Sequence, residues 1–209
     1  MQNLGGSMKR ANRVGISLIV LILMPLSIMG QGGGYTGDEV LTITKELAKN
    51  LEWPADKVGD LVANIKKAMQ GEIYKQEVEP KAITGVFVYR ATEAGLILKV
   101  MRGSGLATFK SGRKAAEISL RSTSVGAHIG GSAEWGAGLV LGLKKDSDLG
   151  GEYTGSARSA VAIDESSSYG VLFTPSAGGS ESHSIFVVIT GRGLSASAGT
   201  SKMTITTSW

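Results

Sequence analysis

The chain is 209 residues long and carries 22 Lys and Arg against 18 Asp and Glu, a formal charge of +4 at pH 7. This length suits one domain with a substantial core. The absence of Cys excludes disulfides, a thiol nucleophile and a cysteine-ligated zinc site, and two His leave little for a histidine-built one. We therefore expect no metal and no cofactor.

Residues 1–30 have the pattern of a secretory signal peptide. Three cationic residues precede the apolar run of residues 14–28, and a basic segment before a short apolar one is typical of an export signal. A helix over this run would span about 22 Å, less than the hydrocarbon core of about 30 Å. We expect cleavage near Gly30 and a periplasmic or envelope-associated protein. The alternative is a retained N-terminal membrane anchor.

The export segment also accounts for most of the positive charge. Without residues 1–30, the chain has 19 cationic and 18 acidic residues. This near balance removes the main support for a nucleic-acid-binding protein, and we expect no nucleic-acid partner. Residues 31–37 are expected to form a flexible Gly-rich leader, and residues 38–209 are predicted to form a single domain.

Residues 38–70 are predicted to form two amphipathic helices. The first has a broad apolar face and ends near residues 50–53. Pro54 suits the start of the second helix, whose apolar residues recur with helical spacing until Gly71 ends it. We expect these faces to pack on a core, because residues 38–80 carry 9 acids and 6 bases, whereas helices on membrane surfaces are cation-rich.

From Lys81 onward the apolar period changes from about 3.6 to about 2. Short alternating segments separated by Gly and Ser predict an antiparallel sandwich or barrel. Gly126, Gly138 and Gly142 are predicted to lie at bends and bulges. The expected fold class is α+β, with two N-terminal amphipathic helices followed by a strongly curved antiparallel β-sheet that is sandwich or barrel-like. The candidate strands are residues 84–90, 94–101, 105–110, 116–120, 124–129, 136–143, 155–163, 170–174, 184–190, 193–198 and 202–207.

No motif for catalysis or phosphate binding is present. The chain has no phosphate loop, no HExxH pair and no nucleophile elbow. His128 and His183 are interpreted as structural or surface residues, since nothing in their spacing supports a catalytic triad. We therefore expect a protein that is not an enzyme and has no catalytic residues.

Positive charge gathers between residues 90 and 121, which hold seven cations and two acids. Such a cluster can bind anionic head groups, at about 1 kcal/mol per Lys or Arg near an anionic surface. The alternative interpretation is a solvated sheet face with a turn at residues 111–114. The candidate lipid-head-group residues are Arg90, Lys99, Arg102, Lys110, Arg113 and Lys114.

Three stretches of the β-rich half resemble the SYLF domain, a lipid-binding module of bacterial exported proteins and eukaryotic membrane-associated proteins. They are residues 81–110 (KAITGVFVYRATEAGLILKVMRGSGLATFK), 122–143 (STSVGAHIGGSAEWGAGLVLGL) and 193–207 (GLSASAGTSKMTITT). The chain departs from the family at Tyr89-Arg90, where a Pro is expected. The resemblance implies a non-enzymatic protein that binds phospholipid, often through anionic head groups, and it supplies no catalytic residues.

The leading functional hypothesis is an exported, non-enzymatic lipid-binding protein whose basic patch captures anionic phospholipid head groups before apolar surface contacts the acyl chains. Its expected partner is a phospholipid or membrane surface, and no protein partner is indicated. One alternative is a small outer-membrane β-barrel, favoured by the export signal, the alternating strands and the C-terminal Trp209. Another is a structural or interaction module of the cell envelope. An exported hydrolase has only scattered Ser, His and Asp in its favour.

Overall fold

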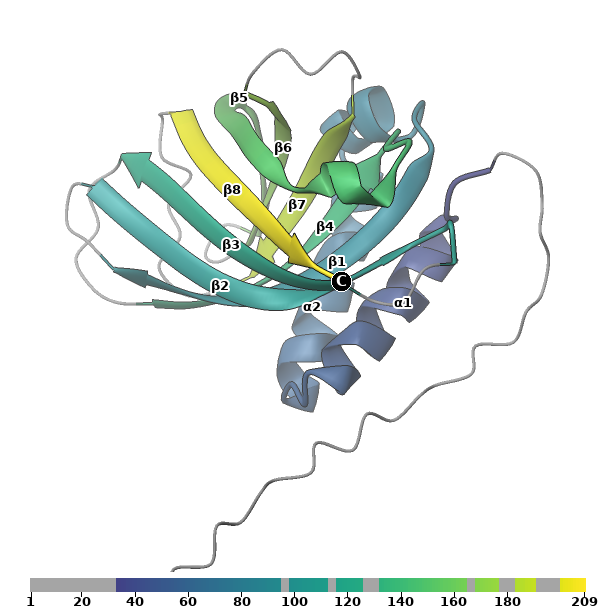
Figure 1. Ribbon diagram of the computed structural model, residues 1–209, viewed down its shortest axis with the longest axis horizontal. Coiled ribbons are helices and arrows are strands. Elements are labelled where there is room, and N and C mark those ends of the chain that lie inside the picture. Colours follow the sequence, from purple (N-terminus) through teal and green to yellow (C-terminus); the bar gives the residue numbers. More distant parts are fainter. Residues whose placement is uncertain are drawn as a thin grey trace, which may run out of the picture. The chain divides into compact units, whose positions relative to one another are not determined.

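The computed structural model describes residues 33–94, 98–112, 116–125, 132–164, 168–176, 183–190 and 200–209, all within one unit of the chain, Gly32–Trp209. The predicted signal peptide lies outside these residues. The described part consists of two N-terminal helices and an eight-stranded antiparallel closed barrel (Figure 1). This architecture confirms the predicted α+β class and is a barrel rather than a sandwich. No helix within the described ranges is long and apolar enough to cross a membrane.

The helices and strands follow one another as the change in apolar period predicts. Two short helices, the π-helix η1 and the 3₁₀ helix η2, were not predicted. Several strands are also longer than the sequence predicts. In chain order the elements are α1 (Gly37–Asn50), α2 (Ala55–Gln70), η1 (Tyr74–Val78), β1 (Ile83–Ala94), β2 (Leu98–Phe109), β3 (Ala116–Val125), β4 (Ser132–Leu141), η2 (Asp146–Leu149), β5 (Gly151–Asp164), β6 (Ser168–Pro175), β7 (Ser184–Thr190) and β8 (Thr200–Ser208).

The ends of the two helices follow from local chemistry. Thr36 and Glu39 form a capping box, in which the Thr36 hydroxyl accepts from the Glu39 N–H at 3.3 Å and the Glu39 carboxylate accepts from the Thr36 N–H at 2.7 Å. Pro54 directly precedes α2, and Gly71 follows its last residue. Both positions agree with the sequence prediction.

The barrel closes because β4 pairs with β1. Around the barrel the strand order is β1-β2-β3-β8-β5-β6-β7-β4, and every neighbouring pair is antiparallel. The predicted break between residues 101 and 105 is wrong, because β2 runs through this stretch without interruption. Gly105 does not end the strand; it lets β2 pass close to β1, where a Cβ would overlap the carbonyl of Val88. The predicted strand at residues 193–198 lies outside the described residues.

Alternation along each strand separates two apolar cores. Along β1, Val86 and Val88 face α1 and α2, whereas Phe87 and Tyr89 face the interior of the barrel. The first core lies between the helices and the outer surface of β1, β4, β6 and β7. Helix α2 is also joined to β7 by a buried hydrogen bond of 2.9 Å from Asn64 to Thr190. On the outer surface of β2, β3 and β8, Arg102, Arg121 and Thr204 are exposed.

Glycines in the strands make room for aromatic rings inside the barrel. Gly138 pairs with Phe87 in regular register, and the phenyl ring covers the space where a Cβ would stand. Gly136 stands in the same relation to Tyr89. The prediction that Gly138 marks a bulge is therefore wrong, whereas Gly142, with φ of 66°, ends β4 in a turn. Gly126 lies outside the described residues.

Candidate functional site

Three arginines lie on the outer surface of the barrel, on adjacent strands. Arg90 of β1, Arg102 of β2 and Arg121 of β3 are all exposed. Arg102 and Arg121 stand directly opposite each other, and Arg90 stands opposite Ser104, two residues along β2 from Arg102. The fold thus brings two of the predicted head-group residues together and adds Arg121 to them. We call these three residues the arginine face.

The arginine face carries concentrated positive charge. Like charges directly opposite each other in an antiparallel pair destabilise the sheet. Within the described part of the chain, none of the three arginines forms an ion pair. The exposed hydroxyl residues Ser104 and Ser119 occupy neighbouring positions on β2 and β3. Guanidinium and hydroxyl groups in this arrangement can donate hydrogen bonds to phosphate or carboxylate oxygens.

Lys110 lies apart from the arginine face and is already engaged. Its ammonium group is 3.0 Å from the Glu39 carboxylate and 4.8 Å from the centroid of the Tyr35 ring. The backbone N–H of Thr36 and the Lys110 ammonium hold the pKa of the Glu39 carboxyl below its usual value. Lys110 therefore ties the start of α1 to the end of β2.

The remaining predicted head-group residues are only partly described. The backbone of Lys99 lies in β2 opposite Ser124, but its side chain is outside the description. Arg113 and Lys114 fall in the gap between β2 and β3 and lie outside the described residues altogether.

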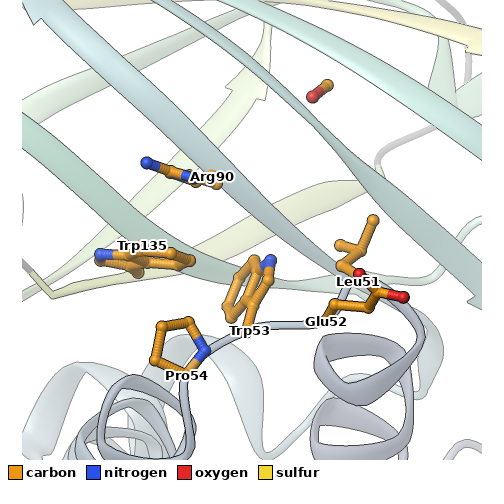
Figure 2. Close-up of a pocket in the computed structure, with 7 residues that line it drawn as sticks. Leu51, Glu52, Trp53, Pro54, Arg90 and Trp135 are labelled. Atoms are coloured by element: carbon orange, nitrogen blue, oxygen red, sulfur yellow. The ribbon is translucent and has the colours of Figure 1, made fainter.

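A pocket adjoins the arginine face at the turn between α1 and α2. Its volume is about 370 Å³, which is within the range of small-molecule sites. Arg90 lies over the ring of Trp135, its partner on β4, with the guanidinium carbon 4.8 Å from the ring centroid. Trp53 approaches Trp135 edge-on from the turn, at 4.8 Å between centroids and 75° between planes (Figure 2). The lining residues are Leu51, Glu52, Trp53, Pro54, Arg90, Ser104 and Trp135.

The turn that carries Trp53 has the hydrogen bonds of a Schellman motif. The Trp53 N–H donates to the Ala48 carbonyl at 3.1 Å, and the Glu52 N–H donates to the Lys49 carbonyl at 2.9 Å. Glu52 is left-handed, with φ of 55°, at the position where Gly is usual. A residue with a Cβ costs about 1–2 kcal/mol in this conformation. Glu52 is therefore strained, and it also lines the pocket.

A hydrogen-bonded pair of polar side chains is buried inside the barrel. The Tyr89 hydroxyl donates to the buried Glu134 carboxylate at 2.6 Å. Burial, together with the negative charge of Glu134, raises the pKa of Tyr89 well above its usual value, so the phenol keeps its proton and remains a donor. This pair holds β1 to β4 from the inside.

His183 has a structural contact within the described residues. The Tyr153 hydroxyl donates to the Leu149 carbonyl at 2.7 Å and lies 3.0 Å from Nε2 of His183. Because the phenol has one proton and uses it on Leu149, Nε2 of His183 is the donor in the second contact. Among the described residues, no group of three or more acidic or histidine side chains is placed to hold a metal ion.

The sequence analysis did not identify Trp53, Trp135 or Glu52 as site residues. Trp53 precedes Pro54 at a helix boundary, a position that indicates a turn but no function. Trp135 lies in β4 and is opposite Arg90 only because β4 pairs with β1 to close the barrel. No local pattern reports that contact, so the pocket could not be predicted from the sequence.

Comparisons with known proteins give a match among solved structures but none among family models or curated proteins. No family model matches the chain, and no curated protein matches it. Among solved structures, the chain is similar to a crystal structure described as a β-barrel-like, uncharacterized protein from Brucella abortus. The two share 17% sequence identity with a TM-score of 0.48, over 85% of this chain and 98% of the other.

Proposed function

We propose that this protein is an exported, non-enzymatic and divergent relative of the SYLF family that binds anionic phospholipid surfaces. The observation that carries the proposal is the arginine face, where two arginines stand directly opposite each other without an acidic partner in the described residues. An anionic surface would relieve the repulsion between them. Exposed charge on the outer surface of the barrel is accessible to a membrane surface.

The surroundings of the arginine face support the same function. The helices cover β1, β4, β6 and β7 and reach β2 at Leu106. Arg102 of β2 and Arg121 of β3 remain exposed. The pocket lined by the half-buried Trp53 and the buried Trp135 lies beside Arg90. The exposed charge therefore borders a pocket that could receive part of a head group.

Vesicle co-sedimentation of the full chain tests the proposal. The double variant Arg102→Gln/Arg121→Gln should bind vesicles rich in phosphatidylglycerol about 30-fold more weakly than the wild type, at about 1 kcal/mol per arginine. The control Lys66→Gln/Lys67→Gln removes two exposed cations from α2 and should bind as the wild type does. The N-terminal apolar segment is common to all three proteins, so differences between them report the arginines.

Two further measurements decide the outcome. Raising the salt concentration should weaken the binding of the wild type and remove its advantage over the arginine variant, because exposed charges are screened. Equal binding by the arginine variant and the α2 control would contradict the proposal. So would an arginine effect of the same size on vesicles of phosphatidylcholine alone.

A membrane-spanning β-barrel is the second candidate. The closed ring of eight antiparallel strands is the architecture that this function requires. A spanning barrel also needs an apolar outer band, whereas exposed outer positions of β3 and β8 are polar, including Glu117, Ser119, Arg121, Thr204 and Thr206. Extraction decides between the two: a spanning barrel should stay in the membrane pellet after high-salt and alkaline washes, and a surface-bound protein should be released.

A further inference from the structure

The pocket between the α1–α2 turn and the outer surface of the barrel holds two opposite charges that do not neutralise each other. Arg90 and Glu52 both line it. Within the described residues they form no ion pair with each other or with any other group. A pocket lined by one cation and one anion suits a ligand that carries both charges.

The Arg90 side chain is arranged to receive the anionic group. One face of its guanidinium lies over Trp135 at 4.8 Å (Figure 2), and this stacking leaves the N–H donors at the edge of the group for a ligand. Ser104, the β2 partner of Arg90, lines the pocket and offers a hydroxyl donor. Phosphate oxygens are suitable acceptors for this pair of donors.

Glu52 supplies the opposite charge. It is an exposed carboxylate at the rim of the pocket, on a left-handed residue that would be more easily accommodated as Gly. A carboxylate accepts hydrogen bonds and donates none, so it favours an ammonium group with N–H donors over a quaternary one. Between the two charges, the rings of Trp53 and Trp135 provide an apolar wall for a short carbon linker.

We propose that this pocket binds a phosphate ester that also bears a primary ammonium group, of the phosphoethanolamine class. The ligand's phosphate contacts Arg90 and Ser104, its ammonium contacts Glu52, and its two-carbon linker lies against the tryptophans. This inference deepens the proposed function, since it names the head group that a protein held at an anionic surface by the arginine face would recognise. The same chemistry occurs in a lipid head group and in the free molecule.

Tryptophan fluorescence provides the measurement. Trp209, whose ring lies 5.7 Å from that of Phe109, is replaced by Phe so that the signal comes from Trp53 and Trp135. In this full-chain background, phosphoethanolamine should produce a saturable change. Arg90→Gln and Glu52→Gln should each weaken binding about ten-fold or more, as expected when a charged hydrogen bond is lost. Phosphocholine, which lacks ammonium N–H donors, should bind as weakly to the wild type as phosphoethanolamine does to Glu52→Gln.

The Glu52→Gln variant decides between a zwitterion site and a simple anion site. Inorganic phosphate should bind this variant at least as well as it binds the wild type, because a nearby negative charge has been removed. The inference is overturned if phosphoethanolamine gives no saturable change, or if Glu52→Gln binds it as tightly as the wild type does. Thermal unfolding of each variant shows whether it is folded, and Lys66→Gln serves as a charge control that should bind normally.

Vesicle binding shows whether the ligand is a lipid head group or free phosphoethanolamine. It also tests the pocket ligand separately from the proposed binding to anionic surfaces. At equal anionic content, vesicles with phosphatidylethanolamine should bind the wild type more tightly than those with phosphatidylcholine, and Glu52→Gln should abolish the difference. If only free phosphoethanolamine binds, the ligand is the soluble ester and the lipid source is wrong. Loss of the arginine effect on anionic vesicles contradicts the proposed function while leaving the fluorescence result intact.

Discussion

Replacing Gly138 by Ala tests how tightly the barrel interior is packed. Gly138 lies in β4 opposite Phe87 of β1, and its φ is not in the left-handed region. Ala can therefore adopt the same backbone conformation, and the whole effect of Gly138→Ala comes from the added methyl group. That methyl group meets the phenyl ring, since Cζ, Cε1 and Cε2 of Phe87 would all lie within 2.7 Å of it.

The cost follows from how little either side can move. The Phe87 side chain is fully buried, and its ring centroid lies 6.2 Å from that of Tyr89, which is itself held by Glu134. Overpacking typically costs about 1–3 kcal/mol. We expect about 3 kcal/mol here, because the added methyl group meets a fully buried ring that lies against Tyr89. For a domain of this size, that loss lowers the melting temperature by about 6–12 °C.

Urea unfolding of the full chain, followed by circular dichroism, measures the effect. The matched control is Gly59→Ala in α2, where a Cβ meets nothing within 4 Å. This control should raise the free energy of unfolding by about 0.5–1 kcal/mol, because Ala favours a helix over Gly. The same chemical change should therefore have opposite signs at the two positions.

A double-mutant cycle identifies the ring as the cause. Phe87→Leu removes the atoms that the new methyl group meets, so Gly138→Ala/Phe87→Leu should be more stable than the sum of the single effects by about 1 kcal/mol or more. Two results would contradict this reasoning: a loss in the free energy of unfolding for Gly138→Ala as small as that of an exposed substitution, or additive effects of the two changes. Either would show that the Gly138–Phe87 contact does not limit the barrel packing.

Two other predictions concern strain and pH. Glu52→Gly should raise the free energy of unfolding by about 1 kcal/mol in thermal denaturation, because Gly adopts the left-handed conformation of this position without strain. The control Glu46→Gly, inside α1, should lower the free energy of unfolding by a similar amount. If both substitutions lower it, the turn is not strained. The free energy of unfolding should fall as the pH rises above about 10, because unfolded Tyr89 ionises there while its raised pKa keeps it neutral in the folded protein. Tyr89→Phe should make this fall less steep in urea titrations from neutral to alkaline pH, and an unchanged slope would contradict the assignment.

The parts of the fold that were predicted correctly depend on local chemistry. The apolar spacing of α2, with Pro54 before it and Gly71 after it, defines both ends of the helix. Strand β7 has the predicted bounds, Ser184–Thr190, because its apolar run is continuous and its ends are polar. In β2 the glycines predict a break that the structure does not contain, because a sequence pattern cannot distinguish a glycine that ends a strand from one that lets a neighbouring strand approach.

The sequence also indicated one part of the candidate site and not the other. Arg90, Arg102 and Arg121 come from three strands that are consecutive in sequence and adjacent in the barrel, so their clustering along the chain already indicated clustering in space. The pocket could not be predicted from clustering along the chain. Trp53 and Trp135 meet only because α1 and α2 pack on the barrel and β4 closes it against β1.

The sequence by itself determined the kinds of element, their order and the stretch in which positive charge gathers, because helical period, strand alternation and charge are properties of near neighbours along the chain. The tertiary structure decided that the sheet closes, which glycines stand opposite Phe87 and Tyr89, and that Lys110 pairs with Glu39. It also decided that a carboxylate, a guanidinium and two indoles share one pocket. These features depend on strand register and helix packing, which join residues far apart in the chain.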